Sequence, residues 1–164
     1  LWAYNIGDTI QFTSLAPFRV IVSGRIKHFI SAFGEHVIAK EVEQALLSAL
    51  KTTELSVSEF TVAPQTTPNV GLPYHEWFIE FDSPPSDVDA FAAQIDAALQ
   101  LQNSYYLDLI QGKVLQPLKI TQVQKGGFQN YMKTIGKLGG QNKTPRLSND
   151  RKIADVLTKN IHTN

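Results

Sequence analysis

The stretch VSGRIKHFISAFGEHVIAKEVEQAL, residues 22–46, combines a charged bend, a short apolar segment and the start of a helix. A Gly-Arg pair leads into the apolar run HFISAF at 28–33, which predicts a short strand. After the Gly-Glu-His turn, apolar residues recur with helical spacing, at Ile38, Val42, Ala45, Leu46 and Ala49. We therefore expect a helix over 38–51. Why a charged bend precedes this helix can be judged only from the sequence on either side.

The sequence on either side of this stretch alternates between strand and helix patterns. Upstream, TIQFTS at 9–14 and FRVIVS at 18–23 alternate apolar and polar residues around Pro17, which predicts a hairpin. Downstream, the patterns predict strands at 58–62, 75–81 and 118–123 and helices at 88–99, 104–111, 128–138 and 150–161, with Asp87 as the N-cap of the first of these helices. This order indicates an α+β domain, in which a small mixed β-sheet is packed with helices.

Composition limits the possible classes of protein. At 164 residues and 43% apolar, the chain is long enough for one well-buried core, and no long linker divides it, so we expect a single domain. The lack of Cys excludes disulfides and zinc–thiolate sites. No apolar run approaches the ~18 residues of a membrane span and no signal peptide is visible, so we expect a cytoplasmic protein without a membrane partner. Because the chain starts at Leu1-Trp2, we expect it to be cut from a longer protein.

The net charge of zero hides an asymmetry along the chain. Residues 1–117 hold 6 Lys and Arg against 13 Asp and Glu, whereas residues 118–164 hold 9 against 2. A basic segment can bind nucleic acid, an anionic ligand or an acidic surface, and the two halves can also simply offset each other. The near-neutral pI of about 7.1 disfavours nucleic acid as a partner.

Several familiar kinds of site fail on inspection. The four His residues have no metal-binding spacing, so we expect no metal site. His75, next to Glu76 in a predicted strand, is expected to face outward. The stretch GKLGGQNKT at 136–144 is superficially similar to a phosphate-binding loop, but Asn142 replaces the Gly that must precede the Lys.

Three polar clusters remain as candidate sites. YNIGD at 4–8 ends in Asp8, whose carboxylate can accept two hydrogen bonds from a ribose diol or cap a turn. Gly24-Arg25 places a guanidinium at a strand end, where it can reach a sugar or a phosphate. GGQNKTPR at 139–146 places Lys143 on a Gly-rich loop that Pro145 stiffens. Taken alone, each cluster favours a structural role over a binding role.

The order of these clusters resembles that of the adenylate-forming superfamily. There, a Tyr-x-x-Gly-Asp segment, a Gly-Arg hinge strand followed by a Gly turn and a helix, and a late loop Lys occur in this succession. On this resemblance Gly24-Arg25 with Lys27 corresponds to the hinge. Gly34 and EVE at 41–43 correspond to the turn and the helix start that follow the hinge. The charged bend in 22–46 then has an explanation.

Within that superfamily the sequence resembles the Gretchen Hagen family of acyl-acid amido synthetases, an auxin-responsive family known from plants and also found in bacteria. NSYY at 103–106 is similar to the family's Asn-x-x-Tyr helix, and QPLKITQV at 116–123 is similar to its Gly-Pro-Leu-Glu-Ile-Arg-Val-Val strand. GFQNYM at 127–132 resembles the next helix, and QNKTPR at 141–146 nearly reproduces Gln-Tyr-Lys-Thr-Pro-Arg. The resemblance implies the C-terminal lid domain of a longer bacterial enzyme, with 1–24 as a hinge-proximal hairpin and 25–164 as the lid core.

The resemblance also implies an activity and a set of roles. ATP with Mg and a carboxylic acid would give an acyl-adenylate, which an amine or amino acid would then attack. Lys143 would be the catalytic cation, Lys27 the hinge, and Asp8, Arg25 and Tyr4 would bind the nucleotide. The main partner would be the enzyme's own N-terminal adenylation domain, which carries most of the nucleotide and acyl pockets.

Two alternatives to this reading stay open. An acid–CoA ligase of the same superfamily would use a thiol in the second step, although the motifs match the amide-forming branch. A binding or interaction domain without catalysis would need none of these roles. The sequence also departs from the plant members at 34–37, where Gly-Glu-His-Val replaces Asp-Lys-Thr-Asp. Glu35 and His36 therefore cannot take the role of that Lys, which lies near the nucleotide in those enzymes.

Overall fold

The largest sheet in the described part of the chain has three strands. The computed structural model describes residues 8–25, 29–51, 53–137, 139 and 142–161, with the backbone alone for 8–9, 23–25 and 160–161. The sheet consists of β5 (Ser56–Gln65), β6 (Tyr74–Ser83) and β7 (Lys119–Val123) in the order β5-β6-β7. The β5–β6 pair is antiparallel and the β6–β7 pair is parallel, so the predicted mixed sheet is confirmed.

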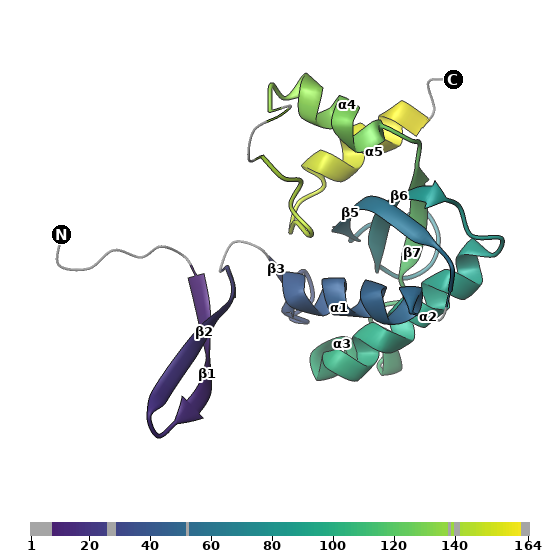
Figure 1. Cartoon of the computed structure of the whole chain (residues 1–164). Coiled ribbons are helices and arrows are strands. Elements are labelled where there is room, and N and C mark those ends of the chain that lie inside the picture. Colours follow the sequence, from purple (N-terminus) through teal and green to yellow (C-terminus); the bar gives the residue numbers. More distant parts are fainter. Residues whose placement is uncertain (1–7, 26–28, 52, 138, 140–141, 162–164) are drawn as a thin grey trace.

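Helices cover both faces of this sheet (Figure 1). On one side lie α1 (Ala39–Leu50), α2 (Val88–Gln102) and α3 (Ser104–Gln111), and on the other α4 (Gly127–Thr134) and α5 (Lys152–Ile161). The apolar side chains form two separate clusters, because alternate residues of a strand point to opposite faces. Trp77 and Ile79 belong to the cluster with α1 and α2, whereas Phe78 belongs to the cluster with α4 and α5. The chain has an α+β fold with β6 buried between two helical layers.

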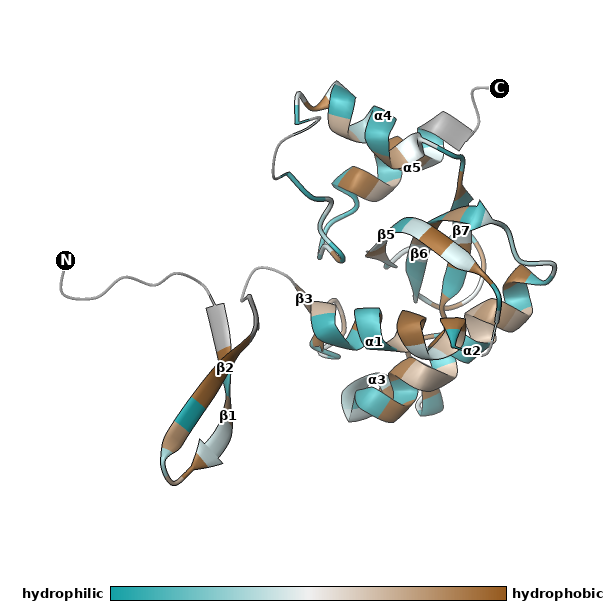
Figure 2. Cartoon of the chain, in the orientation of Figure 1, coloured by the Kyte–Doolittle hydropathy of each residue, from teal (hydrophilic) through white to brown (hydrophobic). Residues whose placement is uncertain are grey.

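A hairpin at the N-terminal end stands apart from these layers (Figure 1). It pairs β1 (Asp8–Leu15) with β2 (Phe18–Arg25), as the alternation around Pro17 predicts. Figure 2 shows hydrophobic residues along β2, and seven large apolar side chains of the hairpin are exposed: Ile10, Phe12, Leu15, Phe18, Val20, Ile21 and Val22. An exposed apolar surface of this extent is typical of a surface that contacts another protein or another domain.

Most of the predicted elements are confirmed, with changes at their ends. Two short strands, β3 (Phe29–Ile30) and β4 (Val37–Ile38), pair with each other before α1, whereas the sequence predicted one strand at 28–33. The helix predicted over 128–138 ends at Thr134. It ends there because Gly136 has a positive φ of 68°, a conformation that terminates a helix. No helix in the described ranges is long and apolar enough to span a membrane.

Side chains fix where the helices begin. The Asp87 carboxylate accepts a hydrogen bond from the backbone N–H of Ala90 at 2.8 Å, so its predicted role as the N-cap of α2 is confirmed. The α4 start is capped from another element, because the Glu80 carboxylate on β6 accepts from the N–H groups of Gly126 and Phe128 at 2.7 and 3.3 Å. A carboxylate in this position satisfies donors that the helix itself leaves unpaired. β6 therefore sets the position of α4.

Replacing Leu99 in α2 with Ala should lower the free energy of unfolding by about 3 kcal/mol, since Leu99 is fully buried and the truncation leaves a cavity. Leu101→Ala is the matched control on the same helix, because Leu101 is 90% exposed, and it should change stability by less than about 0.5 kcal/mol. Urea unfolding followed by circular dichroism measures both. Equal losses in the two variants would contradict the described packing of α2.

Candidate active site

The segment that follows Lys143 is fixed to the edge of the sheet. The N–H of Val62 on β5 donates to the carbonyl of Arg146 at 3.0 Å, and the N–H of Ser148 donates to the carbonyl of Val62 at 2.9 Å. These bonds form a parallel bridge between Val62 and Leu147, so residues 146–148 extend the sheet beyond β5. The Thr61 hydroxyl also donates to the carbonyl of Pro145 at 2.8 Å. The loop therefore has a rigid base directly after Lys143.

Arg146 ties the same segment to α1 and β5. Its guanidinium forms ion pairs with Glu43 on α1, at 3.2 Å, and with Glu59 on β5. It also lies over the ring of Phe60, 4.7 Å from the centroid. These contacts give Arg146 a structural part in shaping the loop.

Lys143 itself is exposed and lines a cavity of about 270 Å³. The cavity lies between α4, the loop and the first half of β5, next to the end of β6. Its lining is mostly polar and comprises Ser58, Glu59, Glu80, Phe128, Gln129, Met132, Lys137, Gly139, Asn142, Lys143 and Thr144. The lysine that the sequence singled out thus borders a hollow large enough for a small polar ligand.

The residues of the predicted nucleotide cluster lie on or before the hairpin. Tyr4 and the hinge residue Lys27 are outside the described residues. Asp8 and Arg25 are direct partners in the β1–β2 register, so the backbone brings these two predicted residues opposite each other. The hairpin and the loop that carries Lys143 lie well apart in Figure 1. The structure therefore joins Asp8 with Arg25 but does not join either of them with Lys143.

The prediction that His75 faces outward is wrong. His75 is completely buried, and its Nε2 donates to the Glu35 carboxylate at 2.9 Å. Glu35 is also completely buried, and it accepts from the backbone N–H groups of Ala32 and Phe33 at 3.3 and 2.8 Å. The prediction failed because β6 is the central strand and α3 covers the face that carries His75, with the Tyr106 ring 5.1 Å from the imidazole. Because helices cover both faces of β6, a side chain in the middle of this strand points into the protein whichever face it is on.

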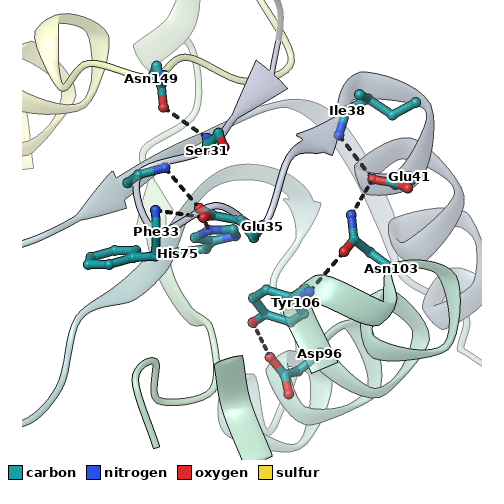
Figure 3. A network of polar contacts seen from close by, with 11 residues as sticks. Ser31, Phe33, Glu35, Ile38, Glu41, His75, Asp96, Asn103, Tyr106 and Asn149 are labelled. Carbon is teal, nitrogen blue, oxygen red and sulfur yellow. Dashed lines mark hydrogen bonds and ion pairs between the residues drawn. The ribbon is translucent and has the colours of Figure 1, made fainter. Parts of the chain in front are cut away.

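A second chain of buried polar contacts lies beside this pair (Figure 3). Asn103 lies between the end of α2 and the start of α3 and contacts α1 as well. Its Nδ2 donates to Glu41 on α1 at 3.1 Å, and its Oδ1 accepts from the N–H of Tyr106 on α3 at 2.8 Å. The Tyr106 hydroxyl donates to Asp96 on α2 at 2.6 Å. Burial, with the Asp96 carboxylate as a further cause, raises the pKa of Tyr106 well above 10.0, so the phenol stays a donor. The sequence analysis noted NSYY at 103–106 only as a family motif and did not predict that Asn103 and Tyr106 connect the helices through buried hydrogen bonds.

The basic C-terminal half lies on acidic residues of the other half. Besides the pairs of Arg146, Arg151 donates to Glu76 on β6 at 2.8 Å. Two arginines of the basic half thus pair with carboxylates of the acidic half, which offsets part of the charge asymmetry along the sequence, one of the alternatives that the sequence left open. Glu76, Phe78 and Glu80 point to the same face of β6. Two carboxylates on a strand face with an apolar residue between them could have indicated that basic side chains or a helix N-terminus pack there. The described residues contain no group of three or more His, Asp or Glu that could hold a metal ion.

An α+β domain with helices on both faces of a mixed sheet and a lysine-bearing loop at its edge has counterparts among known proteins. Residues 40–152, more than half of the chain, match the family described as "GH3 family C-terminal domain". The chain therefore belongs to the GH3 family and corresponds to its C-terminal domain. No curated protein matches it.

Solved structures show the same fold. A structure titled "GH3.15 acyl acid amido synthetase" matches 94% of this chain with a TM-score of 0.73 at 20% identity. Another, titled "AtGH3.15 acyl acid amido synthetase in complex with 2,4-DB", matches 94% with a TM-score of 0.70 at 19% identity. The chain spans 30% of the length of each of these proteins. At these identities the likeness establishes the fold, and the family match agrees with the resemblance found in the sequence.

Stability should depend on pH through Glu35. Burial raises the pKa of its carboxyl, but the hydrogen bonds from His75 and the backbone outweigh burial, so the net pKa lies below the ordinary 4.5. A lowered pKa in the folded chain means that the ionised carboxylate stabilises the fold. This contribution is fully present above pH 4.5 and is lost as the pH falls through the lower pKa of the folded chain.

Glu35→Gln should therefore lower the free energy of unfolding by about 2 kcal/mol at pH 7, because a charged acceptor of buried hydrogen bonds is lost. The difference from the unsubstituted chain should shrink as the pH falls from 5 towards 3. Glu54→Gln, at an exposed position, is the control and should change little at any of these pH values. Urea titrations at pH 7, 5, 4 and 3 test this, and a pH-independent difference would contradict it.

Proposed function

We propose that this chain is the C-terminal lid domain of an ATP-dependent, AMP-forming acyl-acid amido synthetase. The family membership supports the class of enzyme. The observation that carries the proposal is the placement of Lys143, exposed beside a polar cavity and followed by a segment fixed to the sheet edge. Because the segment after Lys143 is fixed, the ammonium group can be held in position beside a ligand in the cavity.

The proposed reaction has two steps. In the first, a carboxylate oxygen of the acid attacks the α-phosphorus of ATP, the bond to the bridging oxygen breaks, and pyrophosphate leaves with the electron pair. In the second, an amine nitrogen attacks the acyl carbon, AMP leaves with the electron pair of the acyl–oxygen bond, and the amine releases a proton. Phosphorus becomes five-coordinate and crowded with negative oxygens only in the first step, so a cation placed beside it favours that step most.

Each predicted residue has a part in this scheme. The Lys143 ammonium would oppose the charge that builds up at phosphorus, and a compact, mobile cation suits this task. Asp8 would accept hydrogen bonds from the ribose hydroxyls, and Arg25, its partner across the hairpin, would support the same sugar. Tyr4 would lie beside the nucleotide. Magnesium would enter with ATP as part of the substrate.

The hairpin would join the lid to the rest of the enzyme. Its exposed apolar residues, which include Phe12, Phe18 and Val22, would pack against the proposed N-terminal adenylation domain. In the order of the chain, Lys27 comes after β2 and before β3. A pivot at Lys27 would let the layers turn relative to the hairpin between the two steps.

Lys143→Ala in the intact protein should slow acid-dependent ATP–pyrophosphate exchange by roughly two orders of magnitude. The reason is that loss of a placed cation at a developing charge commonly costs about 3 kcal/mol. Amide formation from a supplied acyl-adenylate should be largely spared, because amine attack on carbon needs no such cation. Lys143→Arg should rescue only in part, since a planar guanidinium does not replace a compact ammonium.

Lys125→Ala is the matched control, because Lys125 is exposed and does not line the cavity. It should leave both half-reactions unchanged, and circular dichroism should show each variant folded. Near-normal exchange in folded Lys143→Ala would refute the catalytic role of Lys143.

Lys27→Pro should separate the two half-reactions. Proline fixes φ near −65° and would hold the lid in one of its two orientations. The half-reaction that uses this orientation should survive, whereas the other should fall by at least tenfold. Equal loss of both half-reactions in a folded variant would contradict a pivot at this position.

A further inference from the structure

The cavity beside Lys143 contains a second lysine that the proposed reaction does not yet use. Lys137 lines the same hollow and is also exposed. Within the part of the chain that the structure describes, neither lysine forms an ion pair. Two unpaired ammonium groups therefore border one small cavity.

The backbone holds Lys137 in place. At the end of α4 the N–H of Lys137 donates to the carbonyl of Met132 at 2.9 Å, and the N–H of Gly136 donates to that of Lys133 at 3.1 Å. Together with the positive φ of Gly136, these bonds form the Schellman motif that closes a helix end. Lys143 is fixed from the other direction, because Thr144 is buried and Pro145 is bonded to Thr61. Both lysines are therefore joined to backbone that is held by hydrogen bonds.

The carboxylates of the cavity already have partners of their own. Glu59 is paired with the Arg146 guanidinium. Both oxygens of Glu80 accept hydrogen bonds from N–H groups at the start of α4, which stabilises its charge locally. The lysines thus remain as the unpaired charges of the cavity, and an anion is the ligand that they can bind.

The size of the cavity narrows the choice of anion. At about 270 Å³ it lies just below the roughly 300–1,000 Å³ of pockets that enclose drug-sized ligands. The cavity is therefore suited to a small anion, and a diphosphate group carries enough charge to engage two cations. Side-chain amides of Gln129 and Asn142 in the lining add hydrogen-bond donors.

We propose that Lys137 and Lys143 together bind a diphosphate group, which is the pyrophosphate portion of ATP before the first step and free pyrophosphate after it. This inference rests on the proposed function and extends it, because it assigns Lys137 as a binding residue for the leaving group. Lys143 acts on the charge at the reacting phosphorus, and Lys137 holds the group that departs. Two ammonium groups beside the pyrophosphate offset the negative charge that it gains at the moment of cleavage.

A direct test is lysine labelling of the intact protein by acetic anhydride, with and without saturating pyrophosphate, read out by mass spectrometry. Labelling of Lys137 and Lys143 should fall at least fivefold when pyrophosphate is present. Labelling of Lys125 and Lys133 should not change, since neither lines the cavity. A parallel arm with ATP in place of pyrophosphate should protect the same two lysines, because ATP carries the same diphosphate portion.

A kinetic test uses Lys137→Ala with Lys133→Ala as its control, one helical turn earlier on α4. Lys137→Ala should raise the KM for pyrophosphate in the exchange reaction about tenfold, the usual effect of losing one charge-assisted contact. It should lower kcat little and leave amide formation from acyl-adenylate unchanged. Lys137→Arg should restore most of the affinity, whereas Lys133→Ala should match the unsubstituted enzyme.

The two tests separate this inference from the proposed function. If pyrophosphate protects both lysines while Lys143→Ala leaves exchange intact, the diphosphate site stands and the catalytic role of Lys143 fails. If Lys143→Ala abolishes exchange while Lys137 is labelled equally in both conditions and Lys137→Ala keeps its KM, the diphosphate site is refuted alone.

Discussion

The burial of β6 on both faces is the constraint on which the rest of the structure depends. Apolar residues of the strand reach both helical layers, with Trp77 and Ile79 on one face and Phe78 on the other. The charged and ionisable side chains that this strand buries find partners inside the protein, because a buried charge without one costs several kcal/mol. His75 meets Glu35, Glu76 meets Arg151, and Glu80 meets the start of α4. These pairs fix the loop after β3 and the starts of α4 and α5 relative to the sheet.

The candidate site follows from the same constraint. Because Glu80 fixes where α4 begins, the eight residues of that helix determine where it ends and therefore where Lys137 lies. The other side of the loop is fixed independently, since residues 146–148 pair with the edge of β5. Lys137 and Lys143 are thus separated by only a few residues of loop while each extends from an ordered flank. The sheet therefore sets the geometry of both flanks from which the two lysines extend.

The sequence predicted the helices and strands better than it predicted which residues pack around them. Helical spacing in 38–51 and alternation in 75–81 are local signals, and the structure has α1 and β6 there. Whether a strand is covered on one face or two depends on residues far away in sequence, such as Tyr106 and Glu35 for His75, and the outward prediction for His75 failed for that reason. The two-residue strand β4 is too short to have a period. The lysine loop was found through a family motif, but the anchoring of its base depends on Thr61 and Val62, whose pairing no local pattern predicts.

The two kinds of cation in the basic half serve different ends. Arg146 and Arg151 each bond carboxylates from the acidic half, and both also donate to backbone carbonyls of β5. A guanidinium suits such fixed, multiple contacts because its donors lie in a rigid plane. Lys137 and Lys143 have no such pairs within the described residues and remain beside the cavity. An ammonium on a flexible stem can exchange water for a phosphate oxygen and back again, as a ligand that arrives and departs requires. The basic half therefore contributes two arginines that hold the halves together, whereas Lys137 and Lys143 are the cations of the proposed diphosphate site.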